Sequence, residues 1–183
     1  MRMKTVVVGT VVLMSAGFAS AQAPAKTNPD QKFVMEAARG GMAEVELGKL
    51  AADKGSRDEV KKFGQRMADD HSKANDELKS LAQTKNVTLP SDVDAKDKAT
   101  HDRFAKLSGA AFDRAYIQHM VAGHRKAVAA FKKESTSGKD PDVKAWATKT
   151  LPTIEDHLKT AQDIAKNVGV VGTSGTKRST HKK

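Results

Sequence analysis

Long stretches of helical periodicity are the feature that most constrains how this chain can fold. Within residues 57–85, apolar side chains recur every three or four positions, the spacing that gathers them on one face of a helix. The stripe consists of Val60, Phe63, Met67, His71, Ala74, Leu78 and Leu81. A stripe of this length is typical of a helix in a bundle, where neighbouring helices cover it. We therefore expect several long helices packed against one another.

The ends of the helices are marked by capping residues. Asn28-Pro29 and Asp140-Pro141 each combine a capping side chain with a proline at the first helical position. Ser56-Arg57-Asp58-Glu59 has the pattern of a capping box. A shorter helix, capped by Ser91-Asp92, is expected over roughly 91–108. The long helices are predicted at 29–54, 57–85, 109–138 and 141–168.

A weak internal repeat suggests how these helices are organised. Residues 58–63 resemble residues 141–146, and Asp70-His71 resembles Asp156-His157. Two copies of one helical hairpin, joined by the short helix, would explain both matches. We therefore predict an all-α fold: a ferritin-like antiparallel four-helix bundle with a short crossover helix between the two hairpins.

The N-terminal residues have the pattern of a signal peptide. Arg2 and Lys4 precede a short apolar run, and small residues precede a predicted cleavage site after Ala21. Residues 1–21 are therefore expected to direct export, and the mature protein is expected to be periplasmic or secreted. A retained N-terminal anchor is the alternative interpretation.

The remaining chain divides into three predicted segments. Residues 22–28 form a linker, and residues 29–168 form the four-helix bundle domain. The stretch 169–183 is basic and rich in Gly, Ser and Thr, which predicts a disordered tail. Such a tail either keeps the protein soluble or contacts an anionic surface of the cell envelope.

Composition excludes several classes of function. The chain has no cysteine, which rules out disulfides, iron–sulfur clusters and cysteine nucleophiles. Aromatic residues make up only 4% of the chain, which together with the export signal argues against a nucleic-acid partner. The sequence does not indicate an oligomeric state.

Three histidines interrupt the apolar stripes of three different helices. His71, His124 and His157 each lie near the middle of a predicted helix. The middles of helices of similar length lie at one level in a bundle, so the three imidazoles are expected to share one layer. Glu44 lies near the middle of the helix at 29–54, on a stripe of small residues, and is expected to join them.

Two interpretations of this layer remain open. One is a single transition-metal ion (Zn, Cu, Fe, Ni or Mn) bound by Glu44, His71, His124 and His157, with Asp70 and Tyr116 orienting the ligands. The protein would then act in metal sequestration or stress protection. The other is a metal-free, hydrogen-bonded cluster that stabilises an envelope or structural interaction protein.

Two further features bear on the metal. Met67 and Met120 lie one turn before His71 and His124, where thioethers suit Cu(I), although methionine also simply fills cores. The Glu-x-x-His motif of di-iron bundles is absent, because Ala68 precedes His71 by three positions. Whether the protein is an enzyme is left open, and four protein ligands would favour a structural or sequestering site over catalysis.

Several motifs together resemble a family of exported bacterial proteins known as a domain of unknown function, often labelled outer-membrane or periplasmic. They are Asp30-Gln31-Lys32-Phe33, Ala43-Glu44-Val45-Glu46-Leu47-Gly48, Phe63-Gly64-Gln65-Arg66-Met67-Ala68-Asp69-Asp70-His71, Phe112-Asp113-Arg114-Ala115-Tyr116 and Thr150-Leu151-Pro152-Thr153-Ile154-Glu155-Asp156-His157-Leu158. The resemblance covers about 29–168 and implies a ferritin-like four-helix fold and export, but no established activity.

The family pattern falls on a defined set of positions: Glu44, Asp70, His71, Asp113, Tyr116, His124 and His157. Of these, Asp113 is expected to be a surface or capping residue. Gly64 stands where alanine is usual in the family, which should loosen its helix by up to ~1 kcal/mol.

Overall fold

The computed structural model describes residues 28–169, which form five α-helices and no strand. The helices are α1 (Pro29–Lys54), α2 (Asp58–Thr84), α3 (Ala95–Ala105), α4 (Gly109–Ser137) and α5 (Pro141–Asn167). The all-α prediction is confirmed for this part of the chain. The predicted signal peptide, residues 22–27 of the linker and the tail from residue 170 onward lie outside the described residues.

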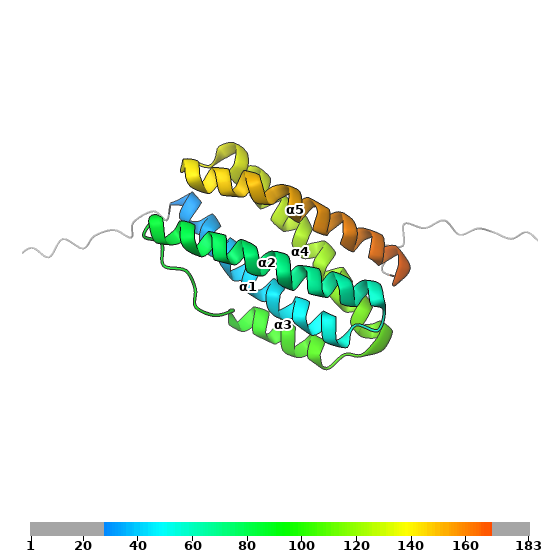
Figure 1. Ribbon diagram of the computed structural model, residues 1–183. Helices are drawn as coiled ribbons and strands as arrows, with labels where there is room; N and C mark the ends of the chain where they lie inside the picture. Colours follow the sequence, from blue (N-terminus) through cyan, green and yellow to red (C-terminus); the bar gives the residue numbers. More distant parts are fainter. Residues whose placement is uncertain (1–27, 170–183) are drawn as a thin grey trace, which may run out of the picture.

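The four long helices form two hairpins. The hairpin of α1 and α2 packs against the hairpin of α4 and α5, with α2 contacting α5 and α1 contacting α4 (Figure 1). The short helix α3 lies outside this group and contacts α1 and α4. None of the helices between residues 28 and 169 combines the length and the hydropathy needed to cross a bilayer.

Two of the predicted helix starts are confirmed at atomic detail. The side chain of Asn28 accepts a hydrogen bond from the backbone N–H of Asp30 at 3.0 Å. The side chain of Asp140 accepts hydrogen bonds from the backbone N–H groups of Asp142 and Val143. These bonds satisfy donors that the first helical turn leaves without an internal partner.

Two predicted caps are wrong. The helix α3 starts at Ala95 and not near residue 91. Its capping residue is Asp94, because the carboxylate of Asp94 accepts hydrogen bonds from the backbone N–H groups of Lys96 and Asp97. The residue that caps α2 is Arg57, without a side-chain hydrogen bond. Ser56 does not act in a capping box, because its hydroxyl donates to a carboxylate on another helix.

That carboxylate belongs to Asp113 of α4. It accepts hydrogen bonds from the backbone N–H of Ser56 at 2.9 Å, from the hydroxyl of Ser56 at 2.6 Å and from the backbone N–H of Arg57 at 3.2 Å. Asp113 is only 1% exposed, so the prediction of a surface residue is wrong. Its carboxylate does accept hydrogen bonds from backbone N–H groups, as a capping residue does, but these lie just before α2 and not on its own helix α4. Asp113 ties the turn between α1 and α2 to the second hairpin.

Asp30 makes the corresponding contact at the opposite turn. Its carboxylate accepts hydrogen bonds from the backbone N–H groups of Lys139 at 3.0 Å and Asp140 at 2.6 Å, in the turn between α4 and α5. Each hairpin turn is therefore held by an aspartate near the start of the other hairpin. This reciprocal arrangement supports the internal repeat inferred from the sequence.

The helices α1 and α2 approach each other closely at two glycines. A Cβ atom on Gly48 would lie 2.7 Å from backbone atoms of Ala68 and Gly64, and a Cβ on Gly64 would lie 2.7 Å from the backbone of Ala52 and Gly48. The expectation that Gly64 simply loosens its helix is therefore incomplete, because the missing side chain is what permits this close contact.

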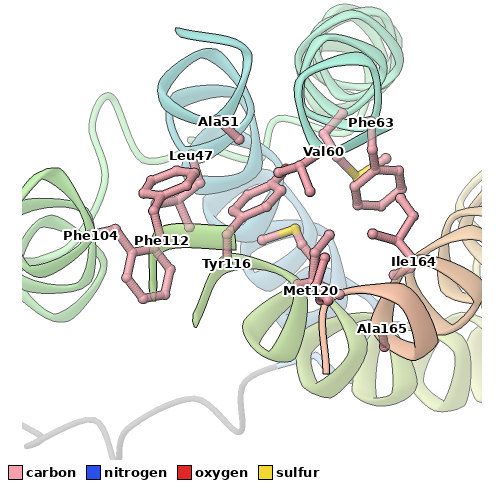
Figure 2. Packing of buried hydrophobic residues seen from close by; sticks show 14 residues of the cluster. Leu47, Ala51, Val60, Phe63, Phe104, Phe112, Tyr116, Met120, Ile164 and Ala165 are labelled. Atoms are coloured by element: carbon pink, nitrogen blue, oxygen red, sulfur yellow. The ribbon is translucent and has the colours of Figure 1, made fainter. Parts of the chain in front are cut away.

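Two apolar clusters form the core of the molecule. One contains Leu47, Val60, Phe63, Met67, Phe112, Tyr116, Met120 and Ile164 among its members (Figure 2). The other is built around Phe33, Val34, Leu78, Phe131, Val143 and Trp146. Along α2, α4 and α5, one histidine of each helix (His71, His124 and His157) lies between the members of these two clusters, which places a polar layer between two apolar ones.

Removing the carboxylate of Asp113 should destabilise the fold. The substitution Asp113→Ala leaves the amides of Ser56 and Arg57 without their acceptor, and we expect the free energy of unfolding to fall by about 2–4 kcal/mol. Urea denaturation followed by circular dichroism measures this. The exposed Asp102→Ala serves as control and should change stability by less than about 0.5 kcal/mol. Equal effects of the two substitutions would contradict the assigned contact.

Candidate metal centre

Three helices each contribute one buried histidine to a single layer. His71 of α2, His124 of α4 and His157 of α5 are 8%, 2% and 1% exposed. One ring nitrogen of each lies within 4.8 Å of those of the other two. The ring centroids are separated by 5.4–5.8 Å. The shared layer predicted from the helix midpoints is present.

Hydrogen bonds determine which nitrogens remain free. The Nε2–H of His157 donates to the carboxylate of Asp70 at 2.7 Å, and the Nδ1–H of His124 donates to the carbonyl oxygen of Met120 at 3.1 Å. Both acceptors lack a proton, so the histidine nitrogen must be the donor in each case. The other ring nitrogen of each histidine therefore carries a lone pair.

Three ring nitrogens of the group, one from each histidine, have no partner in the described part of the chain. Nε2 of His71, Nε2 of His124 and Nδ1 of His157 are buried and make no hydrogen bond there. A buried polar atom left unpaired costs about 1–3 kcal/mol. Each of the three histidines has such an atom, and ring nitrogens of the three lie within 4.8 Å of one another, so a cation bound among them could satisfy them.

Burial also keeps the three imidazoles neutral. Burial, together with the charges of the neighbouring His124 and His157, lowers the pKa of His71 to about 3. Burial lowers the pKa of His124 to about 4, and it lowers the pKa of His157 as well. At neutral pH all three rings are therefore in the form that binds metals, because a protonated ring nitrogen has no lone pair to donate.

Asp70 anchors His157 from the outside of the layer. Its carboxylate also accepts from Nε of Arg66 at 3.2 Å, and Arg66 pairs with Asp156 at 2.7 Å. Although partial burial opposes it, the hydrogen bonds from His157 and Arg66 hold the pKa of Asp70 below its usual value. Asp70 thus fixes the orientation of the His157 ring. Arg66 is not among the residues predicted above, although its spacing of four residues from Asp70 on one helix indicates such a pair.

Glu44 lies beside the histidine group but is not part of it. Its Oε1 is 3.9 Å from Nδ1 of His124, the nitrogen that faces Met120 rather than the free one. Its Oε2 is buried without a partner in the described residues. Burial, reinforced by the charge of Asp97, raises the pKa of Glu44 to about 8. The structure thus brings three of the four predicted ligands together and leaves Glu44 at the edge.

Tyr116 lies one layer away, in an apolar environment. Its ring stacks on Phe112 with centroids 5.9 Å apart, and its hydroxyl is buried without a hydrogen-bond partner among the described residues. Burial raises the pKa of Tyr116 well above its usual value, and the charge of Glu44 adds to the effect. Met67 and Met120 belong to the same apolar cluster as Tyr116, which favours their core-filling interpretation (Figure 2).

The comparison with protein families identifies the chain. The model of a domain of unknown function, DUF4142, matches residues 15–164. The protein therefore belongs to the DUF4142 family, and the structure shows that the described part of this member is helical. The sequence has no significant match among curated proteins.

Several solved structures resemble this chain. A DUF305 fragment from Deinococcus radiodurans matches with a TM-score of 0.67 at 12% sequence identity. The match covers 79% of this chain and 98% of the fragment. A DUF305 protein from Streptomyces coelicolor has a TM-score of 0.66 at 17% identity, covering 78% and 93%. CopM in the Cu(I)-bound form has a TM-score of 0.63 at 20% identity, covering 78% and 98%. At these identities the likeness establishes the fold alone.

Replacing one histidine distinguishes a binding site from a stabilising cluster. The side chain of His71 makes no hydrogen bond in the described part of the chain, and its buried Nε2 is unpaired. We expect His71→Leu to raise the free energy of unfolding of the metal-free protein by about 1–2 kcal/mol, because an unpaired polar group is exchanged for an apolar one. Thermal unfolding in the presence of a chelator measures the change.

The contrasting variant is His157→Leu, which breaks the hydrogen bond to Asp70 and should lower stability. If His71→Leu instead destabilised the protein as much as His157→Leu, the histidines would serve as a stabilising cluster.

Proposed function

We propose that this protein binds a single transition-metal ion through His71, His124 and His157, in metal sequestration or stress protection. Two observations carry the proposal. Ring nitrogens of three buried, neutral imidazoles lie within 4.8 Å of one another, and each ring has a buried nitrogen without a partner. Such an arrangement destabilises the metal-free fold, so it needs a compensating role. We further interpret the two packed hairpins and the helix between them as a ferritin-like four-helix bundle domain spanning 29–168.

The candidate ions are Zn, Cu, Fe, Ni and Mn, and Cu(I) is the first to test. Imidazole nitrogens suit several of these metals, so the donor set alone does not choose among them. CopM, which has a similar fold, has been solved in a Cu(I)-bound and in a silver-bound form. A soft monovalent ion is also compatible with three neutral nitrogen ligands.

Glu44 remains the proposed fourth ligand, and Tyr116 remains a proposed orienting residue. The unpartnered Oε2 of Glu44 supports its role. To bind an ion held by the free Nε2 of His124, the carboxylate would have to leave its position beside Nδ1. Gly123 leaves space for this side chain, because even a Cβ there would stay 3.6 Å from Oε1 of Glu44.

The site is proposed to operate outside the cytoplasm. The signal-peptide pattern of residues 1–21 supports export, and the similar Streptomyces coelicolor structure is described as a candidate secreted protein. The basic segment 169–183 is proposed as a point of contact with an anionic envelope surface.

A metal-free role in the envelope is the second candidate. It is favoured by the hydrogen bonds that His157 and His124 already make to Asp70 and to the carbonyl of Met120. These two bonds give the cluster some internal order without an ion. They leave one nitrogen of each ring unpaired, which is why metal binding is preferred.

Metal content tests the proposal directly. Untagged protein spanning Gln22 to Lys183 is offered each of the five metals in turn, with copper as Cu(I) under reducing conditions, and analysed by elemental mass spectrometry after desalting. We expect about one ion per chain for at least one metal. The triple variant with leucine at positions 71, 124 and 157 should retain none.

The matched control is His119→Ala, which removes a half-buried histidine of α4 that packs on Phe104 instead of joining the layer. It should bind as the unchanged protein does. No stoichiometric metal in the unchanged protein, or equal binding by the triple variant, would refute the proposal.

Asp70 should control the affinity rather than the presence of the site. Without its carboxylate, His157 loses the hydrogen bond that orients Nδ1 toward the other two rings. We expect Asp70→Ala to weaken metal binding by about 10–100-fold, while the neighbouring and exposed Asp69→Ala leaves it unchanged. Competition with a chelator of known affinity measures both. Equal affinities would show that Asp70 does not position His157 for binding.

A further inference from the structure

The exposed face of α4 differs in charge from the exposed faces of the other long helices. On α1, α2 and α5, acidic and basic side chains are both exposed, such as Glu46 and Lys49 of α1. The acidic residues of α4 are Asp113 and Glu134, and both are buried, at 1% and 7% exposed. Its arginines and lysines are all exposed: Arg114, Arg125, Lys126, Lys132 and Lys133. Burial of the two acids therefore leaves a purely cationic surface on this helix.

The neighbouring helix α5 neutralises only part of this surface. Lys132 pairs with Glu155 of α5 at 2.7 Å, whereas the other basic side chains of α4 form no ion pair with the described residues. Charges of one sign repel one another and attract a partner of the opposite sign. The face is therefore suited to an anionic partner.

The edge that α3 forms does not cancel the charge either. Arg103 of α3 is exposed, and its guanidinium lies 4.7 Å from the ring centroid of Phe104, which in turn packs on His119 of α4. Of the acidic residues on α3, Asp97 is half-buried and Asp102 pairs with a lysine of its own helix. Arg103 therefore extends the cationic face of α4 onto α3.

The cations are spread along the helix and are not gathered at one point. Arg114 and Lys133 are nineteen residues apart, which corresponds to roughly 28 Å along the helix axis. The exposed positions between them include Ala122 and Ala129, whose short side chains leave the charged groups accessible. A row of this length contacts an extended phosphate-bearing surface at several points, whereas a small anion would reach only one or two of the charges.

The surroundings of α4 favour a lipid surface over a nucleic acid. Its aromatic residues, which could otherwise stack on bases, are buried: Phe112, Tyr116 and Phe131. The helix is packed against α1, α3 and α5 and does not project, so it is not free to enter a groove of duplex DNA. Because the apolar side of α4 lies in the core, the helix also does not insert among acyl chains, and contact is limited to the headgroups.

We propose that the exposed face of α4 docks the protein on a membrane surface that carries anionic phospholipids. The headgroup phosphates pair with Arg114, Arg125, Lys126 and Lys133, and with Lys132 where it leaves Glu155. At such a surface each basic residue raises the affinity about fivefold. The docking face stands on the charge distribution of α4, so it depends neither on the histidine group nor on the segment 169–183.

Vesicle binding tests the proposal. The chain from Gln22 to Lys183 is mixed with vesicles of phosphatidylglycerol and phosphatidylcholine in equal parts, or of phosphatidylcholine alone, and the bound fraction is measured by cosedimentation. We expect binding to the anionic vesicles only. Raising the NaCl concentration from about 50 to about 300 mM should release the protein, because salt screens contacts between exposed charges.

Two triple variants with the same change in net charge locate the docking face. The first replaces three cations of α4: Arg114→Gln, Arg125→Gln and Lys126→Gln. The second replaces three exposed lysines of α2, which contacts α1 and α5 and lies across the bundle from α4: Lys62→Gln, Lys73→Gln and Lys79→Gln. We expect the α4 variant to bind anionic vesicles about a hundredfold more weakly and the α2 variant less than about threefold more weakly.

The basic segment at the C-terminus is controlled separately. Both triple variants are measured again after glutamine replaces its four basic residues: Lys177→Gln, Arg178→Gln, Lys182→Gln and Lys183→Gln. Any contribution of this segment is then absent from both proteins, and the difference between the α4 and α2 variants should persist.

A fluorescent label supplies a second measurement that leaves every cation in place. Because the chain has no cysteine, Ala122→Cys on α4 and Ser72→Cys on α2 each create a single attachment site at an exposed position. We expect anionic vesicles to change the emission of an environment-sensitive fluorophore at position 122 and not at position 72. Circular dichroism verifies folding, and the labelled proteins decide the matter if the α4 triple variant is not folded.

Several results would overturn the proposal. They are the absence of binding to anionic vesicles, equal binding to neutral ones, equal affinities of the two triple variants, and equal responses of the two labels. Loss of all binding when the C-terminal cations are replaced would assign the contact to that segment instead. Tighter binding to duplex DNA than to vesicles at the same salt concentration would assign the face to a nucleic acid. None of these results bears on whether the histidines hold a metal.

Discussion

The burial of three imidazoles between two apolar clusters is the constraint on which the rest of this structure depends. The apolar clusters supply the free energy of folding and hold α2, α4 and α5 at one level. The imidazoles contribute little to that free energy, because one nitrogen of each ring is buried unpaired. The packing of the apolar clusters must therefore offset the free energy lost by burying these unpaired nitrogens. Functional sites in proteins are commonly destabilising in this way, and the rest of the fold compensates for them.

Three of the four residues predicted as ligands lie in one group in the structure. Asp70 and the carbonyl of Met120 fix the orientations of His157 and His124, so the direction of their lone pairs is determined before any ligand arrives. Glu44 remains outside the group, with its Oε1 3.9 Å from Nδ1 of His124. Three nitrogens alone would leave one coordination position unfilled by protein, and the proposed movement of Glu44 would fill it.

The relatives share the fold, whereas function depends on the side chains that each member places on it. DUF4142 membership and the likeness to DUF305 structures and CopM establish a helical domain with two packed hairpins. The reciprocal contacts of Asp30 and Asp113 explain how such a domain closes, since each hairpin secures the turn of the other. The histidine layer is then a feature that this chain builds on the scaffold.

The sequence by itself determined the helices, their apolar stripes and the common level of His71, His124 and His157, because these follow from periodicity within one helix and from helix length. It did not reveal that Ser56 bonds to Asp113, that Gly64 permits close packing, or that Glu44 stays at the edge of the layer. Those features depend on how each helix is rotated about its axis and how closely it approaches its neighbour. Only the tertiary structure decides such rotations and distances, since they result from the packing of all the helices together.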